Sequence, residues 1–212
     1  YVISLRGGDV PGFEPSINWL HILLKPIRYA VYRKATAIVA NSHSLSKLSR
    51  ATDPFFVGVI TNGVDINFFK PRVRTNSDAS PLLKILMVSR FRAQKNLLRS
   101  LVMLEHARRV GIDYALTLVG DGPEHRNILG FVKSRDLNDV VALPGWIGKS
   151  ELASVYQASD CFLSLSLYEG MSNTILEAMA SSIPVLASDI PAHREVIEHG
   201  IIDLAIITHQ QP

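Results

Sequence analysis

Residues 161–180 read CFLSLSLYEGMSNTILEAMA and decide how the whole chain is interpreted. Their apolar start is typical of a buried strand, and the helical pattern that follows begins near Ser172 or Asn173, either of which is a suitable N-cap. Between strand and helix lies a loop that contains Gly170, which lets a ligand approach the backbone closely. Ligands of open α/β sheets bind at such strand-to-helix junctions. We therefore expect an α/β fold with a ligand site in this loop.

The rest of the chain repeats this strand-to-helix pattern. Short β-branched runs alternate with helical patterns, which predicts βα units around a mostly parallel sheet. The predicted strands are 1–5, 37–40, 56–60, 84–89, 114–120, 140–145, 161–166, 184–188 and 204–208. The predicted helices are 16–35, with a kink at Pro26, and 43–50, 95–110, 123–135, 149–158, 172–181 and 192–198.

A segment rich in proline, serine and asparagine divides the chain. We interpret 1–66 as the trailing part of one domain, 67–81 as a linker and 82–212 as a second domain. Three strands make a poor doubly wound sheet, and Tyr1 begins directly in a β-rich run. We therefore expect that an upstream part is missing and that the second domain is incomplete at its end.

The composition narrows the class of protein. The chain has 212 residues, of which 47% are hydrophobic and 19% charged, and this favours a globular protein over a disordered one. Its net charge of +3 suits phosphate-bearing ligands or an anionic membrane surface, but is too small to indicate nucleic acid. The single cysteine, Cys161, lies in an apolar run and is expected to be buried and structural. No apolar run reaches the ~20 residues that span a bilayer, so we expect a soluble, cytoplasmic protein.

Polar groups gather around the opening loop. The free amides at the helix start form a predicted anion site and belong to Gly170, Met171, Ser172 and Asn173. Glu177 leans back toward that helix start, where a carboxylate suits vicinal hydroxyls such as those of a ribose. Glu169 would reach another part of the same ligand. The spacing taken alone favours two solvated glutamates on an ordinary amphipathic helix.

Other strand-to-helix junctions carry further candidates. Arg90 and Lys95 in SRFRAQKN (89–96) could clamp a pyrophosphate, although basic residues in a first helical turn usually face solvent. The stretch VGDGPEHRNIL (119–129) partly imitates a dinucleotide fingerprint, but His125 replaces its third glycine, so we interpret it as a turn. In LPGWIG (143–148), Ile147 and its neighbour Trp146 could flank a base.

The segment 16–35 combines apolar residues with basic ones. Such a helix can lie on a membrane surface. A helix that packs on its own sheet with a solvated basic side explains the pattern as well.

These motifs in this order resemble the retaining GT-B glycosyltransferases of family 4, also described as glycosyl transferases group 1. The resemblance rests on NGVD, on SR with a lysine five residues after the arginine, and on VGDGPE, LPGW, SLYEGMSNTILEAMA and PVLASDIPAHREVI. It covers nearly the whole chain and implies two Rossmann-like domains. The carboxyl-terminal domain would hold the nucleotide-sugar donor and the amino-terminal domain the acceptor.

The resemblance also implies residue roles. Arg90 and Lys95 would clamp the donor diphosphate, Glu177 would bind the ribose, and Glu169 would hold hydroxyls of the transferred sugar. Residues 170–173 would contact phosphate and sugar, and Ile147 would offer backbone to the base. No metal and no cofactor are expected, because two cations would do the work of a divalent metal.

One residue departs from the family pattern. Arg6 stands where the family often has a histidine near the donor sugar. It could hydrogen-bond sugar or phosphate, or merely pair with Asp9.

These expectations define a hexosyltransferase of polysaccharide biosynthesis that transfers a sugar from a nucleotide-diphosphate donor, expected to be UDP-linked, to a glycan or lipid-linked acceptor. We expect no nucleic-acid partner, and contact with the inner membrane face is an open alternative. The rival functions are a truncated nucleotide-sugar-binding module without transfer activity, and an epimerase or phosphorylase on a related fold. The sequence does not indicate the oligomeric state.

Overall fold

The computed structural model of the chain describes residues 1–72, 82–197 and the strand 204–207. Much of the predicted linker 67–81 and most of the chain's end therefore lie outside the described residues. The described chain forms two compact units. The first comprises Tyr1–Gly63, Tyr168–Ser172 and Ile190–Ile197, and the second comprises Val64–Leu167, Asn173–Asp189 and the strand 204–207. The division into 1–66, 67–81 and 82–212 stays a prediction, and each unit is described below by itself.

The first unit is built on a three-stranded parallel sheet. Its strands β1 (Val2–Leu5), β2 (Ala37–Ala40) and β3 (Gly58–Val59) pair in the order β1-β2-β3. The helices of this unit are η1 (Pro15–Ile17), α1 (Asn18–Leu23), α2 (Lys25–Lys34), α3 (His43–Thr52) and α8 (Pro191–Arg194). The predicted kink at Pro26 takes the form of a break between α1 and α2 at Leu24. Alternate strand residues and the helices bury one small core, which includes Leu5, Ile38 and Leu45.

The second unit is built on a six-stranded parallel sheet. Its strands are β4 (Leu83–Val88), β5 (Tyr114–Val119), β6 (Val141–Gly145), β7 (Cys161–Ser164), β8 (Val185–Ser188) and β9 (Leu204–Ile207). They pair in the order β6-β5-β4-β7-β8-β9. Renumbered from the first strand of the unit, this order is 3-2-1-4-5-6, the doubly wound order of Rossmann sheets. The strand order reverses between β4 and β7, and this reversal is the topological switch point of the sheet.

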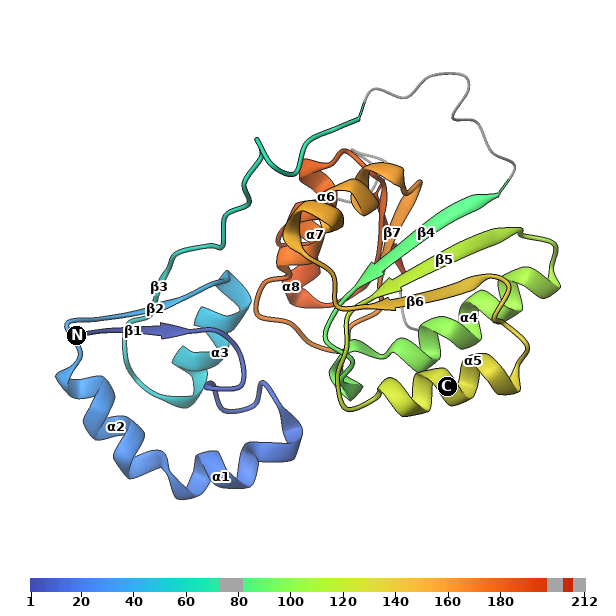
Figure 1. The fold of residues 1–212 in the computed structure, drawn as a ribbon. Helices are drawn as coiled ribbons and strands as arrows, with labels where there is room; N and C mark the ends of the chain where they lie inside the picture. The colour runs from blue at the N-terminus through green and yellow to red at the C-terminus, as the bar shows by residue number, and fades with distance from the viewer. Residues whose placement is uncertain (73–81, 198–203, 208–212) are drawn as a thin grey trace. The chain divides into compact units, whose positions relative to one another are not determined.

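Helices cover both faces of this sheet (Figure 1). The helices α4 (Leu97–Arg109) and α5 (His125–Ser134) lie side by side on one face, and α6 (Lys149–Ala158) and α7 (Asn173–Ala180) lie on the other. The core between α4, α5 and the sheet is continuous and includes Leu101, Leu118 and Ile128, none of which is exposed to solvent. Cys161 is also buried in this core, as its apolar surroundings predict.

The predicted α/β class is confirmed, and most predicted elements differ from the observed ones only at their ends. One local difference concerns the helix predicted for 95–110. A short 3-10 turn, η3 (Ala93–Lys95), comes first, and Asn96 then adopts a left-handed conformation with φ of 54° before α4 begins at Leu97. Lys95 therefore lies ahead of the long helix and not in its first turn. No helix of the described residues is long and apolar enough to cross a membrane.

Candidate functional site

A small pocket lies at the switch point of the second sheet. Its walls come from the carboxyl ends of β4 and β7, from η3 and α4, and from the first turn of α7. The lining residues are Met87, Val88, Ser89, Lys95, Leu97, Leu163, Ser164, Ser166 and Thr174. The pocket has a volume of about 10 Å³, which is roughly what one water molecule requires. It can therefore accept a single oxygen-sized group, such as one oxygen of a phosphate.

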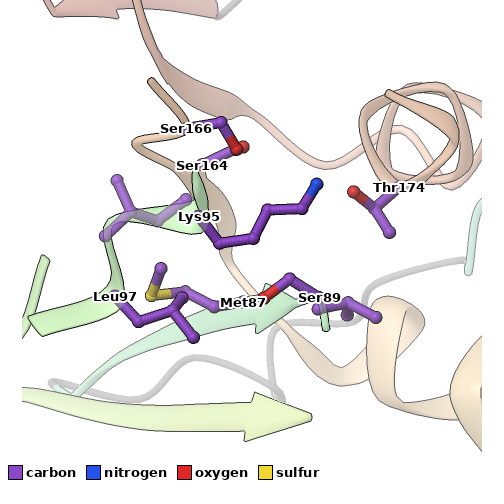
Figure 2. A pocket seen from close by; sticks show the side chains of 9 residues that line it. Met87, Ser89, Lys95, Leu97, Ser164, Ser166 and Thr174 are labelled. Atoms are coloured by element: carbon purple, nitrogen blue, oxygen red, sulfur yellow. The ribbon is translucent and has the colours of Figure 1, made fainter. Parts of the chain in front are cut away.

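One cationic side chain, that of Lys95, and several hydroxyl-bearing side chains line the polar part of this pocket (Figure 2). The Lys95 side chain extends into the space between the Ser164 and Ser166 hydroxyls and that of Thr174. The Ser89 hydroxyl oxygen is buried without a hydrogen-bond partner among the described residues. An ammonium group and hydroxyl donors together favour a phosphate or another oxyanion in this position.

The turn that carries Lys95 is fixed by the backbone around it. The amide of Leu167, just after β7, donates to the carbonyl oxygen of Gln94 at 2.9 Å. The Lys95 amide in turn donates to the carbonyl oxygen of Arg92 at 2.9 Å. The cation therefore stands on a hydrogen-bonded loop that ties the end of β4 to the end of β7.

The predicted turn in VGDGPE (119–124) also contacts the loop after β4, at Ser89 and Phe91. The Phe91 amide donates to the carbonyl oxygen of Asp121 at 2.8 Å, and the Glu124 amide donates to that of Phe91 at 2.9 Å. A Cβ atom on Gly120 would lie 1.9 Å from the carbonyl oxygen of Ser89, and one on Gly122 would lie 2.6 Å from that of Phe91. The two glycines therefore permit close packing of backbone on backbone, and this packing positions residues 89–91.

Glu177 lies on α7 and is half-buried. Its Oε2 atom accepts a hydrogen bond from the hydroxyl of Tyr156 on α6 at 2.9 Å. Burial raises the pKa of this carboxyl, while the Tyr156 hydrogen bond and the charge of Lys149 lower it. A carboxylate that is only partly desolvated and has one oxygen fixed can still accept hydrogen bonds from ligand hydroxyls.

A second polar cluster lies within the first unit. The Arg6 guanidinium donates to Asn62 Oδ1 at 3.2 Å, and the Asn62 amide lies 3.3 Å from the sulfur of Met171. The carboxylate of Asp9 accepts from the backbone amide of Arg6 at 3.0 Å. Asp9 therefore pairs with the backbone amide of Arg6 and not with its side chain, and among the described residues the guanidinium pairs with no acid.

Gly170 belongs to this cluster as well. A Cβ atom there would lie 2.5 Å from the carbonyl oxygen of Arg6 and 2.9 Å from Asn41 Oδ1. A glycine is therefore needed for the loop after β7 to approach β1 this closely. Gly170, Met171 and Arg6 therefore lie close together within this unit, whereas their contact with a ligand stays a prediction.

The remaining predicted residues fall in loops and at helix starts. Arg90 is exposed in the loop after β4, and among the described residues it does not line the switch-point pocket. Ile147 lies half-buried after β6, next to the exposed Trp146. Ser172 and Glu169 belong to the first unit, and Asn173 is the first residue of α7. Their roles stay predictions.

The sequence interpretation assigned no role to several hydroxyl-bearing residues. Four of them line the pocket, namely Ser89, Ser164, Ser166 and Thr174. The fifth, Tyr156, lies beside Glu177. A weak signal exists for two of them. Ser164 and Ser166 are two residues apart at the end of a strand, and this spacing places both on one face. The spacing of seven residues between Lys149 and Tyr156 likewise places both on one face of a helix.

Metal ligation gives no further candidate. Among the described residues, no group of three or more His, Cys, Asp or Glu side chains could hold a metal ion. The expectation of a metal-independent reaction stays a prediction.

Comparison with known proteins identifies relatives. The family model described as glycosyl transferases group 1 matches residues 72–211. The chain is 30% identical to the N-acetyl-alpha-D-glucosaminyl L-malate synthase of Bacillus anthracis, over 94% of this chain and 52% of that protein. It is also 30% identical to the UDP-Gal:alpha-D-GlcNAc-diphosphoundecaprenol alpha-1,3-galactosyltransferase of Escherichia coli, over 69% of this chain and 40% of that protein. The chain therefore spans about half the length, or less, of these relatives.

The fold has solved counterparts. The structure of Anabaena HepE in complex with UDP-glucose superposes with a TM-score of 0.80 at 22% identity, covering 99% of this chain and 58% of HepE. At this level of identity the likeness concerns the fold, which is of the GT-B type. The family match covers well over half of the chain. The chain therefore belongs to the glycosyl transferases group 1 family.

Proposed function

We propose that this chain binds the diphosphate and ribose of a nucleotide sugar and belongs to a glycosyltransferase. The observation that carries the proposal is the pocket at the switch point, which Lys95 and four hydroxyl-bearing residues line. Doubly wound sheets bind nucleotides at this position. Family membership and the expected role of Glu177 at the ribose support the same assignment.

The proposed chemistry follows from charge. When the bond between the anomeric carbon and the diphosphate oxygen breaks, negative charge grows on the leaving phosphate and the sugar becomes electron-poor. A cation fixed beside that phosphate stabilises the transition state more than the ground state. Lys95, with Arg90 in the adjoining loop, would supply this charge.

The acceptor completes the reaction that we propose. Its hydroxyl oxygen bonds to the anomeric carbon on the face that the diphosphate leaves, and its proton passes to the leaving phosphate oxygen. The products are a glycoside with retained configuration and a nucleoside diphosphate. In this scheme Glu169 would hold hydroxyls of the sugar. A protein base is not required.

The relatives suggest the substrates. HepE was solved with UDP-glucose, and the Escherichia coli relative is described as a UDP-Gal transferase that acts on a diphosphoundecaprenol-linked sugar. We therefore propose UDP as the nucleotide and a glycan or lipid-linked sugar as the acceptor. The rival is a nucleotide-sugar-binding module without transfer activity, and an epimerase on a related fold is a more distant alternative.

Two measurements on the 212-residue chain separate these functions. Isothermal titration with UDP, ADP and GDP tests the nucleotide site, and release of UDP from UDP-sugars in the presence of acceptor tests transfer. Binding with release supports the transferase, whereas binding without release supports the module. Failure of all three nucleotides to bind would refute the assignment of the site.

Variants test the residue roles. Glu177→Ala should weaken UDP binding, because ribose hydroxyls lose their acceptor, and Glu151→Ala on the exposed face of α6 is the matched control. Lys95→Ala should lower turnover more than affinity, because its charge acts mainly in the transition state. Lys133→Ala on the exposed side of α5 controls for the loss of one positive charge. If Glu177→Ala and Lys95→Ala both behave like their controls, these roles are wrong.

We also propose that α1 and α2 contact an anionic membrane surface. The exposed fractions of Trp19, Ile22 and Leu23 on α1 are 66%, 77% and 67%. The two helices carry no acidic residue, and basic residues such as Lys25 lie beside the apolar ones. Apolar side chains together with positive charge suit the interface of a bilayer that contains anionic headgroups.

Vesicle binding tests this surface in a Trp146→Phe background, so that Trp19 is the reporting fluorophore. Vesicles with phosphatidylglycerol should shift its emission to the blue, and vesicles of phosphatidylcholine alone should do so much less. Ile22→Ser should weaken the binding, whereas Val102→Ser, an exposed apolar position on α4, should not. Absence of binding to anionic vesicles, or self-association through this surface in sedimentation, would contradict the proposal.

A further inference from the structure

The buried Tyr156 donates a hydrogen bond to Glu177, the residue that we propose binds the ribose of the nucleotide. Tyr156 on α6 has no solvent-exposed surface, and its ring packs edge-on against Phe69, with centroids 5.6 Å apart, and at a tilt against Phe162, with centroids 5.8 Å apart. These contacts leave the ring little freedom. This packing therefore fixes the position of the Tyr156 hydroxyl within the second unit.

That hydroxyl has two acceptors on α7 within reach. It lies 2.9 Å from Glu177 Oε2 and 3.1 Å from the carbonyl oxygen of Thr174. It has only one proton, and a hydrogen bond to a charged oxygen is stronger than one to a neutral carbonyl. The proton is therefore directed mainly to Glu177.

The other carboxylate oxygen is in a different situation. Among the described residues, Glu177 Oε1 has no hydrogen-bond partner, and the side chain is only half-buried. One oxygen is thus held by the protein, and the other is left to accept hydrogen bonds from a ligand. A carboxylate oriented in this way needs no reordering when ligand hydroxyls arrive.

We propose that Tyr156 is a positioning residue of the nucleotide site, acting through its hydrogen bond to Glu177 Oε2 to orient Oε1 toward the ribose hydroxyls. The inference rests on the proposed function, in which Glu177 binds ribose. In this role Tyr156 does not contact the ligand. Through Glu177 it nevertheless sets how strongly the chain prefers a ribonucleotide to its deoxy form.

The charged and titratable groups around Glu177 define a pH signature for this role. Besides Tyr156, the ammonium of Lys149 acts on the carboxyl from α6, and it lies 4.4 Å from the centroid of the Phe68 ring. Tyr156 and Lys149 both lower the pKa of Glu177, against burial, which raises it. Tyr156→Phe removes one of the two lowering influences. The carboxyl of the variant should therefore take up its proton at a higher pH, and UDP binding should be lost at a higher pH when the solution is acidified.

The test measures UDP and 2′-deoxy-UDP binding by titration calorimetry across pH. Tyr156→Phe should weaken UDP binding about tenfold at neutral pH, by analogy with groups that orient a metal-binding side chain. It should reduce the preference for UDP over 2′-deoxy-UDP and move the acidic midpoint of binding upward. In a Glu177→Gln background the same substitution should change UDP affinity less than about twofold, because the pair has already lost its charge.

Tyr114→Phe is the matched control. Tyr114 on β5 is as deeply buried as Tyr156, and its hydroxyl has no hydrogen-bond partner among the described residues. Its removal should leave UDP affinity, deoxy discrimination and the pH midpoint unchanged. A tyrosine that merely packs would behave in the same way at position 156.

The outcomes separate the two proposals. If wild-type protein does not bind UDP, the proposed function fails, and this inference fails with it. If UDP binds and Glu177→Gln weakens it, but Tyr156→Phe retains wild-type affinity and pH midpoint, only the role of Tyr156 is refuted. Equal losses from Tyr156→Phe with and without Glu177 would also refute it.

Discussion

Replacement of Gly120 by alanine should destabilise the second unit severely. Gly120 has a φ of 129°, which L-residues with a Cβ rarely adopt. An added Cβ would stand 1.9 Å from the carbonyl oxygen of Ser89, more than 1 Å inside any contact that real Cβ atoms make. The backbone at the end of β5 must therefore move away from the end of β4.

The magnitude follows from what that movement disrupts. Holding alanine in this backbone region costs about 1–3 kcal/mol. The hydrogen bonds at risk are Gly120 N–H to Gly145 O at 2.9 Å and Ser89 N–H to Val119 O at 3.1 Å. Each contributes about 1 kcal/mol. The total loss is about 3–5 kcal/mol of unfolding free energy.

A second glycine supplies the control. Gly130 lies inside α5 on an exposed face, and an added Cβ would meet nothing within 4 Å. Alanine there should stabilise the helix by about 0.5–1 kcal/mol, because it loses less backbone entropy on folding. The two variants make the same chemical change in the same unit with opposite expected signs.

Urea denaturation followed by far-UV circular dichroism measures both variants. With a denaturant slope of about 2 kcal/mol/M, the midpoint for Gly120→Ala should fall by about 2 M, and that for Gly130→Ala should rise by a few tenths of a molar. Lys95 stands on the loop held by this turn, so UDP binding should weaken with Gly120→Ala even where the variant is folded. Similar midpoints for the two variants would show that the close approach at Gly120 does not support the fold.

Three further expectations concern titratable groups that are buried wholly or in part. Burial raises the pKa of the Cys161 thiol to about 11. At pH 8 a thiol-reactive disulfide reagent should therefore label the protein only as fast as it unfolds. Immediate labelling of the native state would contradict the buried position. Burial also raises the folded-state pKa of Glu177 above its ordinary value of 4.5, so the folded state holds this proton more tightly and stability should fall as pH rises from that value through the folded pKa. Glu177→Gln should therefore be more stable than wild type at pH 7 and equal to it below about pH 4, and a thermal melt that shows wild type more stable at pH 7 would contradict this sign. Arg28→Met should lower the free energy of unfolding by about 3–5 kcal/mol in urea denaturation, because it leaves the buried carboxylate of Asp53 without its guanidinium partner. Arg28→Met combined with Asp53→Leu should recover much of this loss. No difference between the single and double variants would refute the pairing.

The type of each element was predictable because its signal is local. Strand β2 and helix α6 have the predicted bounds, since a β-branched run or a helical period is visible within a few residues. The start of α4 was not predictable, because the left-handed Asn96 and the turn before it depend on backbone contacts with the loop after β7. The break at Leu24 was anticipated from Pro26, whose ring disrupts the helix that precedes it.

The candidate site was predicted in part. Lys95 and Glu177 were identified as candidates by motif and by resemblance, and the structure places both in the second unit among polar side chains. The partners that surround them, above all Tyr156 and Ser89, could not be identified, because a serine or tyrosine in an apolar run carries no distinctive local pattern. Their significance depends on which atoms they meet.

The sequence by itself determined that this chain is an α/β protein of alternating strands and helices with charged and amide-rich loops at its strand ends, because hydrophobic period, glycine turns and helix caps act between near neighbours. Only the tertiary structure decided that β4 lies beside β7, with Ile85 paired to Cys161, and that the Tyr156 hydroxyl meets Glu177. Those pairings join residues that are far apart in the chain. They are selected by the burial of the whole sheet and its helices, which no short stretch of sequence contains.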